Sequence, residues 1–531
     1  MTNAVTPISP KSSEHAEIYD LFIVGGGVNG AGIAADAQGR GLKVMLCEQN
    51  DLAQATSSAS SKLIHGGLRY LEHYEFRLVR EALAEREVLL KNAPHLIKPL
   101  RFILPHRPHL RPAWMIRIGL FLYDHLSTRN QLPGSKGVKL FADDDSNPLN
   151  NSIEYGFMYS DCRVDDSRLV VANALSAEEN GAKILTRTRC QSAYRKDGLW
   201  HVSMEDIDTG KITYCRARGL VNASGPWAQK FIETKLRAKS PRGVRLIKGS
   251  HFVVPKMYDG DQAYILQNED QRIVFVIPYN NDFTMVGTTD KEYKGDPKDV
   301  AMDSEERDYL LDIVNKHFEK QISADDIVWD WSGVRPLCDD ESSSPSAITR
   351  DYTLELETDD HDKAPLLSIF GGKITTYRKL AEAAVATLEP FYPQMGKAWT
   401  REAPLPGGDI DIDFAQWMET IRKSYPWLSD RHLERVCNAY GSRVHQALGG
   451  AQCEKDLGEH FGADLYAREV DYLIREEWAR SAEDIIWRRS KLGLYLDKDQ
   501  VQHLEDYVKQ RIPPLMELKK LEDPGFRKVS G

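Results

Sequence analysis

Three glycines and one glutamate near the start of the chain have the spacing of a dinucleotide-binding site. Gly25, Gly27 and Gly30 form the sequence G-x-G-x-x-G directly after the apolar run 19–24, and Glu48 follows 18 residues after Gly30. The first glycine permits a tight turn, the second lets the backbone approach a diphosphate, and the third lets the following helix pack closely. The helix N-terminus offers N–H groups to phosphates, and the carboxylate accepts hydrogen bonds from ribose hydroxyls. This fingerprint predicts a bound dinucleotide and does not distinguish NAD from FAD.

The elements that must position these residues are a strand, a helix and a second strand. The segments 19–24 and 43–48 have the continuous apolar character of buried strands. Short strands with turns are expected over 183–220, and another buried strand over 366–370. The strand-rich region 244–290 suits an antiparallel sheet outside the nucleotide domain.

Helices are expected in the remaining parts of the chain. A charged helix is predicted from about 75 to 92 and a capped helix over 165–181. Residues 409–531 show helical periodicity and many charges, without a strand pattern or a catalytic cluster. The tryptophans there have the spacing of core anchors: Trp417, Trp427, Trp478 and Trp487. We expect a separate helical domain with a structural or partner-binding role.

Composition limits the class of protein. The 531 residues are 41% hydrophobic and 28% charged, which is typical of a soluble globular protein of two to four domains. The net charge of -10 does not favour a nucleic-acid partner. Seven scattered cysteines without a C-x-x-C pair argue against a disulfide framework and a cysteine zinc site, and fit a reducing compartment. We see no secretory signal in 1–18 and no apolar stretch of the roughly 20 residues that cross a membrane.

One short apolar segment has the composition of a membrane-interface helix. Residues 113–123 are apolar and aromatic but contain Arg117, and Arg107 and Arg111 precede them. Such a segment can lie flat on an anionic membrane with its basic side chains toward the headgroups. A core helix and a dimer contact fit the same composition.

Several other motifs resemble a known family. They are Ala55-Thr-Ser-Ser-Ala-Ser-Ser-Lys62, His65-Gly-Gly-Leu-Arg-Tyr70, Asn222-Ala-Ser-Gly-Pro-Trp227, Gly333-Val-Arg-Pro336 and Phe370-Gly-Gly-Lys-Ile-Thr-Thr376. With the opening fingerprint they resemble the FAD-dependent glycerol-3-phosphate dehydrogenases and, more broadly, flavoenzymes of the D-amino-acid-oxidase type. The resemblance runs from about residue 18 to the C-terminus, and the region after about 405 resembles the additional C-terminal domain of the aerobic bacterial members.

This resemblance implies a fold and a domain division. The implied fold class is α/β: a FAD-binding Rossmann-like domain of the glutathione-reductase and D-amino-acid-oxidase type, an antiparallel-sheet substrate domain and a C-terminal helical domain. The expected boundaries are 18–95, 160–235 and 335–395 for the discontinuous FAD-binding domain, 96–159 and 236–334 for the substrate or cap domain, and 405–531 for the helical domain.

The resemblance also implies an activity. It implies FAD as cofactor, oxidation of sn-glycerol 3-phosphate to dihydroxyacetone phosphate by hydride transfer to flavin N5, and electron delivery to a membrane quinone. Peripheral attachment to the cytoplasmic face of the inner membrane, often as a homodimer, is implied as well. This chemistry requires no metal.

Roles for several charged residues follow from that activity. The substrate is a phosphate dianion, which bidentate guanidinium donors bind best. Arg335 is therefore the first candidate for a phosphate anchor, Arg69 the second and Arg350 the third. His65 is favoured as the proton acceptor or orienter of the C2 hydroxyl, and His251 is its rival.

The other expected contacts concern the substrate hydroxyls and the flavin. Tyr70 is expected to hydrogen-bond the substrate, and Lys373 to add positive charge at the pyrimidine edge of the flavin or at the substrate. The glycines before Lys373 are expected to begin a helix whose N-terminus faces that edge and favours the anionic reduced flavin. The expected cofactor-binding residues are Gly25, Gly27, Gly30, Glu48, Ser58, Ser60, Ser61, Lys62, Gly66, Gly67, Ala223, Gly225, Gly371, Gly372, Lys373 and Thr375.

Three alternatives stay open. An oxidase could transfer electrons from the same substrate to oxygen, because oxygen reactivity depends on access to the reduced flavin. An amino-acid oxidase would need a carboxylate clamp, and two or three converging cations suit a phosphate better. A FAD-binding membrane-associated protein without turnover would have no use for His65, Arg69, Arg335 and Lys373 together.

Overall fold

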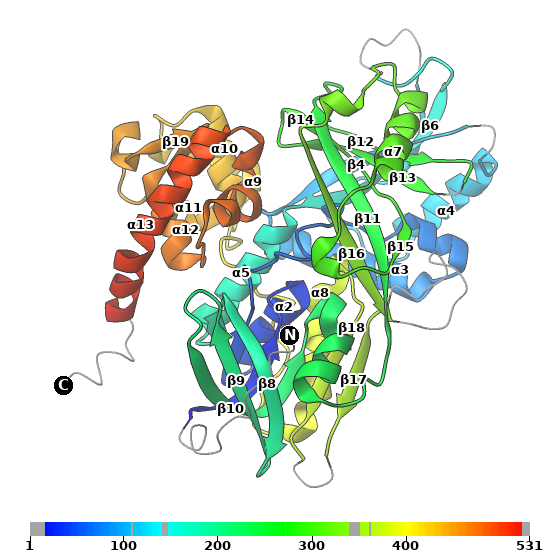
Figure 1. Cartoon of the computed structure of the whole chain (residues 1–531). Helices are drawn as coiled ribbons and strands as arrows, with labels where there is room; N and C mark the ends of the chain where they lie inside the picture. The colour runs from blue at the N-terminus through cyan, green and yellow to red at the C-terminus, as the bar shows by residue number, and fades with distance from the viewer. Residues whose placement is uncertain are drawn as a thin grey trace.

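The computed structural model describes residues 16–107, 110–140, 147–270, 272–338, 351–359 and 363–522. The chain forms three parts, which Figure 1 shows as an α/β part at the bottom, a sheet-rich part at the upper right and a helical part in orange and red at the upper left. The predicted α/β architecture with a second sheet and a C-terminal helical domain is therefore confirmed.

A mostly parallel sheet around the fingerprint strand forms the core of the first part. Its strands are β1 (Ile18–Val24), β2 (Val44–Cys47), β7 (Lys183–Leu185), β8 (Thr188–Lys196), β9 (Leu199–Asp206), β10 (Ile212–Asn222), β17 (Thr353–Glu357) and β18 (Leu366–Phe370). The order is β17-β18-β10-β1-β2-β7, and β8 and β9 continue from β10 as an antiparallel extension. β1 pairs in parallel with both β2 and β10. This arrangement brings the carboxyl ends of the central strands to one edge, where ligands bind in sheets of this kind.

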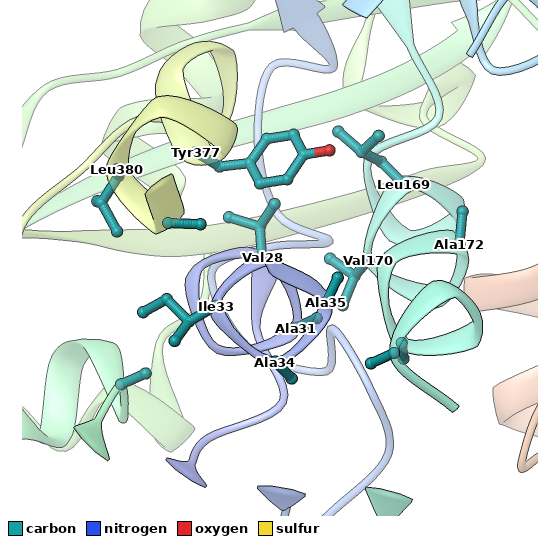
Figure 2. Close-up of a cluster of buried hydrophobic side chains, with 14 of the residues drawn as sticks. Val28, Ala31, Ile33, Ala34, Ala35, Leu169, Val170, Ala172, Tyr377 and Leu380 are labelled. Carbon is teal, nitrogen blue, oxygen red and sulfur yellow. The ribbon is translucent and has the colours of Figure 1, made fainter. Parts of the chain in front are cut away.

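Three helices pack together against this sheet. They are α2 (Val28–Gly39), α5 (Asp166–Glu179) and α8 (Tyr377–Thr387). Figure 2 shows Ala31 and Ala35 of α2 facing Val170 of α5, with Tyr377 of α8 above them. Small side chains allow this approach, because a methyl group on Gly32 would lie 2.9 Å from the Tyr377 ring.

The second part is built on a larger sheet. Its strands are β3 (Leu63–Ile64), β4 (Ile97–Pro105), β5 (Lys136–Lys139), β6 (Tyr155–Val164), β11 (Val244–Pro255), β12 (Ala263–Gln267), β13 (Ile273–Tyr279), β14 (Phe283–Gly287), β15 (Lys291–Tyr293) and β16 (Trp329–Cys338). The order is β15-β11-β14-β13-β12-β4-β6-β3, with β16 also paired to β11 and β5 to β6. Only the β12–β4 pair among the described strands of this sheet is parallel, so the antiparallel sheet predicted over 244–290 is confirmed. The expected boundaries at 160 and 335 fall inside β6 and β16, which both belong to this sheet.

Helices flank the second sheet. α7 (Ser304–His317) buries Leu310 and Val314 in a core shared with β11 and β13. Three further helices lie on the side of the second part that faces away from the helical domain (Figure 1). They are η1 (Leu68–His73), α3 (Phe76–Asn92) and α4 (Ala113–His125).

α4 is amphipathic and lies on the surface. Leu120 and Tyr123 are buried, whereas Trp114, Ile118 and Phe121 are 63%, 52% and 53% exposed. This exposed face excludes the core-helix alternative for 113–123, while the membrane and dimer alternatives stay predictions. Among the described helices, no helix has the length and apolar character needed to cross a membrane.

The third part is helical and has its own hydrophobic core. Its elements are α9 (Phe414–Ser424), α10 (Asp430–Tyr440), α11 (Val444–Leu448), β19 (His460–Gly462), β20 (Leu465–Tyr466), α12 (Ala467–Glu476), the π-helical turn η10 (Asp484–Arg489) and α13 (Lys498–Glu522). Trp417, Trp427 and Trp487 pack against this core, as their spacing predicts. Trp478 packs instead into the core of the first part, so it joins the two domains.

Candidate active site

A long cavity of about 970 Å³ lies where the two sheets meet. Its walls come from the fingerprint loop, the segment after β2, η1, the strands β11 and β16, and the turn after β18. Its volume is at the upper end of the range for ligand pockets. An elongated ligand that reaches from the α/β part into the second sheet fits these walls.

The fingerprint end of the cavity has the form of a diphosphate cradle. Gly25 has φ +115°, and a Cβ on Gly30 would lie only 1.9 Å from the carbonyl oxygen of Gly25. The N-cap residue of α2, Gly27, has no side-chain cap, although the N–H of Val28 donates to Ser57 Oγ at 3.0 Å. Asn29 also lines the cavity, and its buried Oδ1 has no partner among the described residues. These features leave polar groups at this end for a ligand to satisfy.

Glu48 is fixed at the wall of the cavity by the backbone. Its Oε2 accepts from the N–H of Gly26 at 2.7 Å, and its Oε1 accepts from the N–H of Asn50 at 2.8 Å. Burial raises the pKa of this carboxyl, and the two N–H donors oppose the rise. The aligned carboxylate is placed to accept from ribose hydroxyls, as the sequence predicts.

The serine-rich segment after Glu48 divides between the cavity and a buried ion pair. Ser60 and Ser61 line the cavity, whereas Ser58 and Lys62 do not. Lys62 Nζ lies 2.8 Å from Asp166 Oδ1, with both side chains buried, and also donates to the carbonyl of Ser58 at 2.9 Å. Lys62 therefore ties this segment to α5. The cofactor contact that the sequence predicts for Lys62 stays a prediction.

The other end of the cavity gathers the residues expected to react with or bind the substrate. His65, Arg69, Tyr70, His251, Arg335 and Lys373 all line it. Residues 65–70 come from the segment around η1, His251 from β11, Arg335 from β16 and Lys373 from the turn after β18. Arg350 lies outside the described residues. Four separate stretches of sequence thus supply one wall of charged and polar groups.

The cations at this end are held by neighbours. Arg335 Nη1 donates to Asp290 Oδ1 at 2.7 Å, and Nη2 donates to Thr288 Oγ1 at 3.3 Å. Lys373 Nζ lies 3.9 Å from the centroid of the Tyr70 ring, a cation–π contact. Asp290 orients Arg335 and offsets part of its charge, whereas the Tyr70 ring orients Lys373 and leaves its charge in place.

His251 is a buried imidazole with one face on Trp331. The ring centroids are 5.1 Å apart and the planes differ by 10°. Its Nε2 shares a hydrogen bond of 2.9 Å with Ser61 Oγ, and its Nδ1 has no partner among the described residues. Burial, together with the positive charges of Arg335 and Lys62, holds the pKa of His251 well below its usual range. The imidazole is therefore neutral at pH 7, and the lowered pKa makes it a weak base.

The turn after β18 differs from the prediction. Gly371 and Gly372 have φ +77° and +99°, a left-handed conformation outside the helical region. A short 3-10 turn over Ile374–Thr376 follows, and α8 begins only at Tyr377. The expectation that the helix begins at the glycines is therefore wrong. The cavity is lined here by backbone and by Thr375, whose Oγ1 accepts from the N–H of His65 at 3.2 Å.

Of the remaining residues predicted to contact the cofactor, some line the cavity and others do not. Gly67, Ala223 and Gly225 line the cavity. Gly66 does not; its N–H donates to Tyr123 Oη at 2.8 Å. Gly30 lies behind the cradle against Gly25.

Sequence reasoning missed several polar residues of the cavity. Arg272 lines it at the start of β13, and Thr288 and Asp290 line it after β14. No motif marks these positions, because a charged residue at a strand end usually faces solvent. Only the pairing of Asp290 with Arg335, 45 residues later, gives it a role. No group of three or more potential metal ligands occurs in the part of the chain that the structure describes.

Comparison with known proteins agrees with this geometry. Residues 20–377 match the family described as FAD dependent oxidoreductase, and residues 398–516 match the C-terminal domain of alpha-glycerophosphate oxidase. A glycerol-3-phosphate dehydrogenase of Pseudomonas aeruginosa is 61% identical over 513 residues, 97% of this chain and 98% of the relative. A D-erythritol 1-phosphate dehydrogenase of Brucella abortus is 52% identical over 481 residues, 90% of this chain and 95% of the relative. The crystal structure of the glycerol-3-phosphate dehydrogenase from Bacillus halodurans complexed with FAD superimposes with a TM-score of 0.72 at 27% identity, covering 96% of this chain and 94% of that one.

Proposed function

The chain belongs to the family of FAD-dependent glycerol-3-phosphate dehydrogenases, and from that premise we propose that it oxidises sn-glycerol 3-phosphate to dihydroxyacetone phosphate. The observation that carries this proposal is the wall of Arg69, Arg335 and Lys373 beside two histidines at one end of the dinucleotide cavity. Guanidinium groups bind a phosphate dianion well, and a neutral imidazole accepts a hydroxyl proton.

The residues of the cavity fit FAD. The glycine cradle and the α2 N-terminus would hold the diphosphate, Glu48 would hold the ribose, and Asn29 Oδ1 would accept from a hydroxyl of the cofactor. When bound, FAD supplies a hydride acceptor at N5.

The chain's own residues have the tasks of binding the substrate and moving its proton. Arg335, with Arg69 as a second donor, holds the phosphate and so fixes the position of C2. His65 or His251 accepts the proton of the C2 hydroxyl. The Nδ1 of His251, which has no partner among the described residues, fits this role, but the lowered pKa of His251 weakens it as a base; the position of His65 beside η1 and Thr375 keeps it as the alternative. Lys373 contributes a positive charge to the same wall, and Tyr70 contributes a hydroxyl group.

A second candidate substrate is a longer polyol phosphate. The identity to the D-erythritol 1-phosphate dehydrogenase is 52%, against 61% for the glycerol-3-phosphate dehydrogenase. Both substrates present a phosphate and a secondary hydroxyl, so the phosphate wall suits either. The higher identity favours glycerol 3-phosphate.

We further propose a membrane quinone as the electron acceptor, reached from the cytoplasmic face of the inner membrane. The exposed face of α4 carries Trp114, Ile118 and Phe121. The buried face of α4 packs with Leu68 and Tyr70 of η1, and these two residues also line the cavity. An anionic membrane bound by α4 would therefore lie next to the end of the cavity where the substrate binds. The homodimer stays a prediction, and light scattering of the purified protein tests it.

The proposed activity is tested by anaerobic titration of the purified flavoprotein with sn-glycerol 3-phosphate. Stoichiometric loss of the oxidised flavin absorbance near ~450 nm is expected, since substrate oxidation reduces the cofactor. D-erythritol 1-phosphate is titrated in parallel, and faster bleaching by it would reverse the choice of substrate. A flavin that neither substrate bleaches would refute the proposal. Reoxidation by a soluble quinone, compared with oxygen, then separates dehydrogenase from oxidase.

Docking by α4 is tested with liposomes. Replacing Trp114, Ile118 and Phe121 by serine should weaken sedimentation with phosphatidylglycerol vesicles by roughly tenfold or more, because apolar burial drives interfacial binding. Val328→Ser, which also changes a half-exposed apolar residue, is the matched control. If both variants bind the vesicles equally well, a dimer contact, and not a membrane contact, is the role of the exposed face of α4.

A further inference from the structure

Four aromatic rings contact one another in a row from the cavity into the C-terminal helical domain; the two outer pairs are stacked and the middle pair is tilted by 36°. His251 lies on Trp331 with ring centroids 5.1 Å apart, Trp331 lies beside Trp329 at 4.5 Å, and Trp329 lies on Trp487 at 4.3 Å. The first three rings come from the β11–β16 ladder, in which His251 is opposite Trp331. Trp487 is supplied by η10 of the helical domain. The stack therefore connects a residue of the cavity wall with another domain.

A glycine closes the stack at each end. A Cβ on Gly287 would lie 2.2 Å from Cδ2 of His251, and a Cβ on Gly493 would lie 2.5 Å from the indole of Trp487. No side chain larger than glycine leaves room for these rings. The two end rings thus each lie directly against the backbone of a glycine, which leaves them little room to move.

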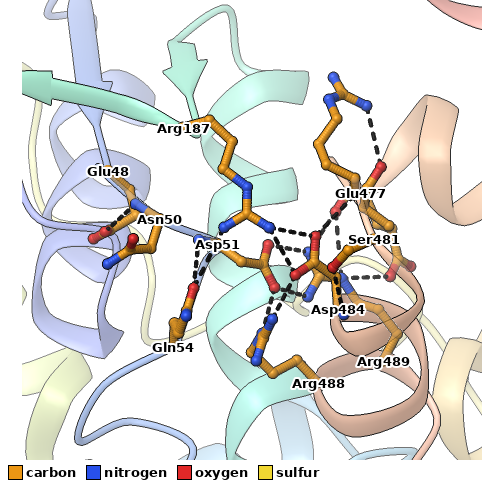
Figure 3. A network of polar contacts seen from close by, with 12 residues as sticks. Glu48, Asn50, Asp51, Gln54, Arg187, Glu477, Ser481, Asp484, Arg488 and Arg489 are labelled. Carbon is orange, nitrogen blue, oxygen red and sulfur yellow. Dashed lines mark hydrogen bonds and ion pairs between the residues drawn. The ribbon is translucent and has the colours of Figure 1, made fainter. Parts of the chain in front are cut away.

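The turn that carries Trp487 is anchored in the first domain. The two following residues, Arg488 and Arg489, both donate to the buried carboxylate of Asp51, which Figure 3 shows at the centre of the network. Asp484 of the same turn accepts from Arg187. These contacts fix the backbone on both sides of Trp487, so its indole is a rigid support.

We propose that Trp487 is a positioning residue for His251 and acts on it through Trp329 and Trp331. The inference rests on the proposed function only where it concerns turnover, since the geometry of the imidazole is a property of the free protein. Its chemical consequence is the exclusion of water from one face of the imidazole and a fixed direction for Nδ1, the nitrogen that has no partner among the described residues.

The charged groups around His251 determine how its titration responds. Arg335 of β16 and Lys62, which precedes β3, face it, and both oppose its protonation. Asp290, after β14, pairs with Arg335, and Asp166 of α5 pairs with Lys62. Ser61 holds Nε2. Loss of the stack changes none of these charges but admits water, so the pKa of His251 should rise toward its ordinary value near 6.5.

The test compares Trp487→Ala, Trp487→Phe and the control Trp427→Ala in the FAD-loaded protein. Trp427 packs on the same helical core outside the stack. The first readout needs no turnover: NMR titration of protein labelled with 15N at histidine, in which His251→Asn identifies the signal. We expect the pKa of His251 to rise in Trp487→Ala, to return in Trp487→Phe and to stay unchanged in Trp427→Ala.

The second readout is the pH profile of turnover with sn-glycerol 3-phosphate. We expect kcat of Trp487→Ala to fall roughly 10- to 100-fold with KM little changed, because a displaced group loses geometry in the reacting state. The acidic limb should move to higher pH, and Trp487→Phe should restore it. Where Trp487→Ala does not fold, Gly493→Ala displaces the indole and takes its place in both measurements.

The possible results separate the two proposals. An unmoved His251 titration in both Trp487→Ala and Gly493→Ala, or an equal shift in Trp427→Ala, would overturn the positioning role and leave the proposed activity standing. A shifted titration in a protein whose flavin no polyol phosphate bleaches would support the positioning role and overturn the activity.

Discussion

Replacing Asp51 by asparagine tests how the helical domain is fixed to the dinucleotide-binding domain. Asp51 is 1% exposed and follows the second strand of the fingerprint. Arg489 donates to its two oxygens at 2.8 Å each, and Arg488 Nε donates at 2.6 Å (Figure 3). Both arginines belong to η10 of the helical domain. Asparagine keeps the shape of the side chain but removes the charge that compensates two buried guanidinium groups.

The expected loss follows from burial. Removing one partner of a buried ion pair typically costs about 3–5 kcal/mol, because the other charge stays without compensation. Arg489 is fully buried and keeps the carbonyl of Glu477 at 2.7 Å and the carboxylate of Glu477, 3.7 Å from its Nε, whereas Arg488 keeps Asp484. The remaining amide oxygen of asparagine still accepts one bond, so the lower end, about 3 kcal/mol, is expected.

Glu483→Gln is the matched control. Glu483 also pairs with Arg488, at 3.1 Å, but its side chain is 64% exposed. Exposed ion pairs contribute about 0–1 kcal/mol. The two variants thus remove a carboxylate from the same arginine in a buried and an exposed setting.

The assay is urea unfolding of the FAD-loaded protein, followed by circular dichroism and by flavin fluorescence. Because a chain of several domains need not unfold in one step, the first transition is compared between variants. We expect Asp51→Asn to unfold its helical domain at clearly lower urea and to release flavin in the same transition, since Asn50 and Gln54, on either side of Asp51, line the cavity. A transition no lower than that of Glu483→Gln would refute the assignment of interdomain stability to this network.

Three other predictions concern the cavity and pH. Arg335→Lys should raise KM for sn-glycerol 3-phosphate roughly 10- to 100-fold with FAD retained, because a bidentate charge-assisted contact contributes about 1.5–3 kcal/mol; an unchanged KM would remove Arg335 from phosphate binding. Gly30→Val should yield protein without flavin absorbance, because its Cβ meets a carbonyl oxygen at 1.9 Å, whereas Gly450→Ala, with open space around it, should keep the flavin. Burial disfavours ionised Asp484, but Arg488, Arg187 and Arg489 outweigh burial and hold its pKa below 3.8. Its contribution is therefore complete above pH 3.8 and lost as pH falls further, so urea midpoints should drop below about pH 4 and less steeply in Asp484→Asn.

The dinucleotide half of the site was predictable because its signals are local. The glycine spacing and Glu48 all lie within two strands and the helix between them. The helix start after Gly372 was not predictable in the same way. A glycine pair before a helical pattern fits both a helix N-terminus and a left-handed turn, and the φ angles that decide between them depend on close contacts, such as that of Gly372 with Leu380.

The substrate half was predictable only through motifs. Sequence indicated His251 and Arg335 one at a time, but their common wall arises from the antiparallel register of β11 and β16. Lys62 has a partner that no motif indicates. A lysine among serines suggests phosphate contact, yet Asp166 lies 104 residues away in the chain and takes its charge. Partners so distant leave no pattern in a single sequence.

The helical domain affects the cavity through contacts between residues that lie far apart in the sequence. Its sequence holds no catalytic cluster, and the structure places no residue of η10 in the cavity. Yet this one turn contacts both ends of the cavity indirectly, through Asp51 beside the dinucleotide cradle and through Trp329, which contacts Trp331 behind His251. Because these contacts come from consecutive residues, Trp487, Arg488 and Arg489, the helical domain cannot move on one sheet without straining its contact to the other. A rigid junction of this kind holds the two halves of the cavity in one relative orientation, which the proposed hydride transfer between ligands bound to different sheets would require.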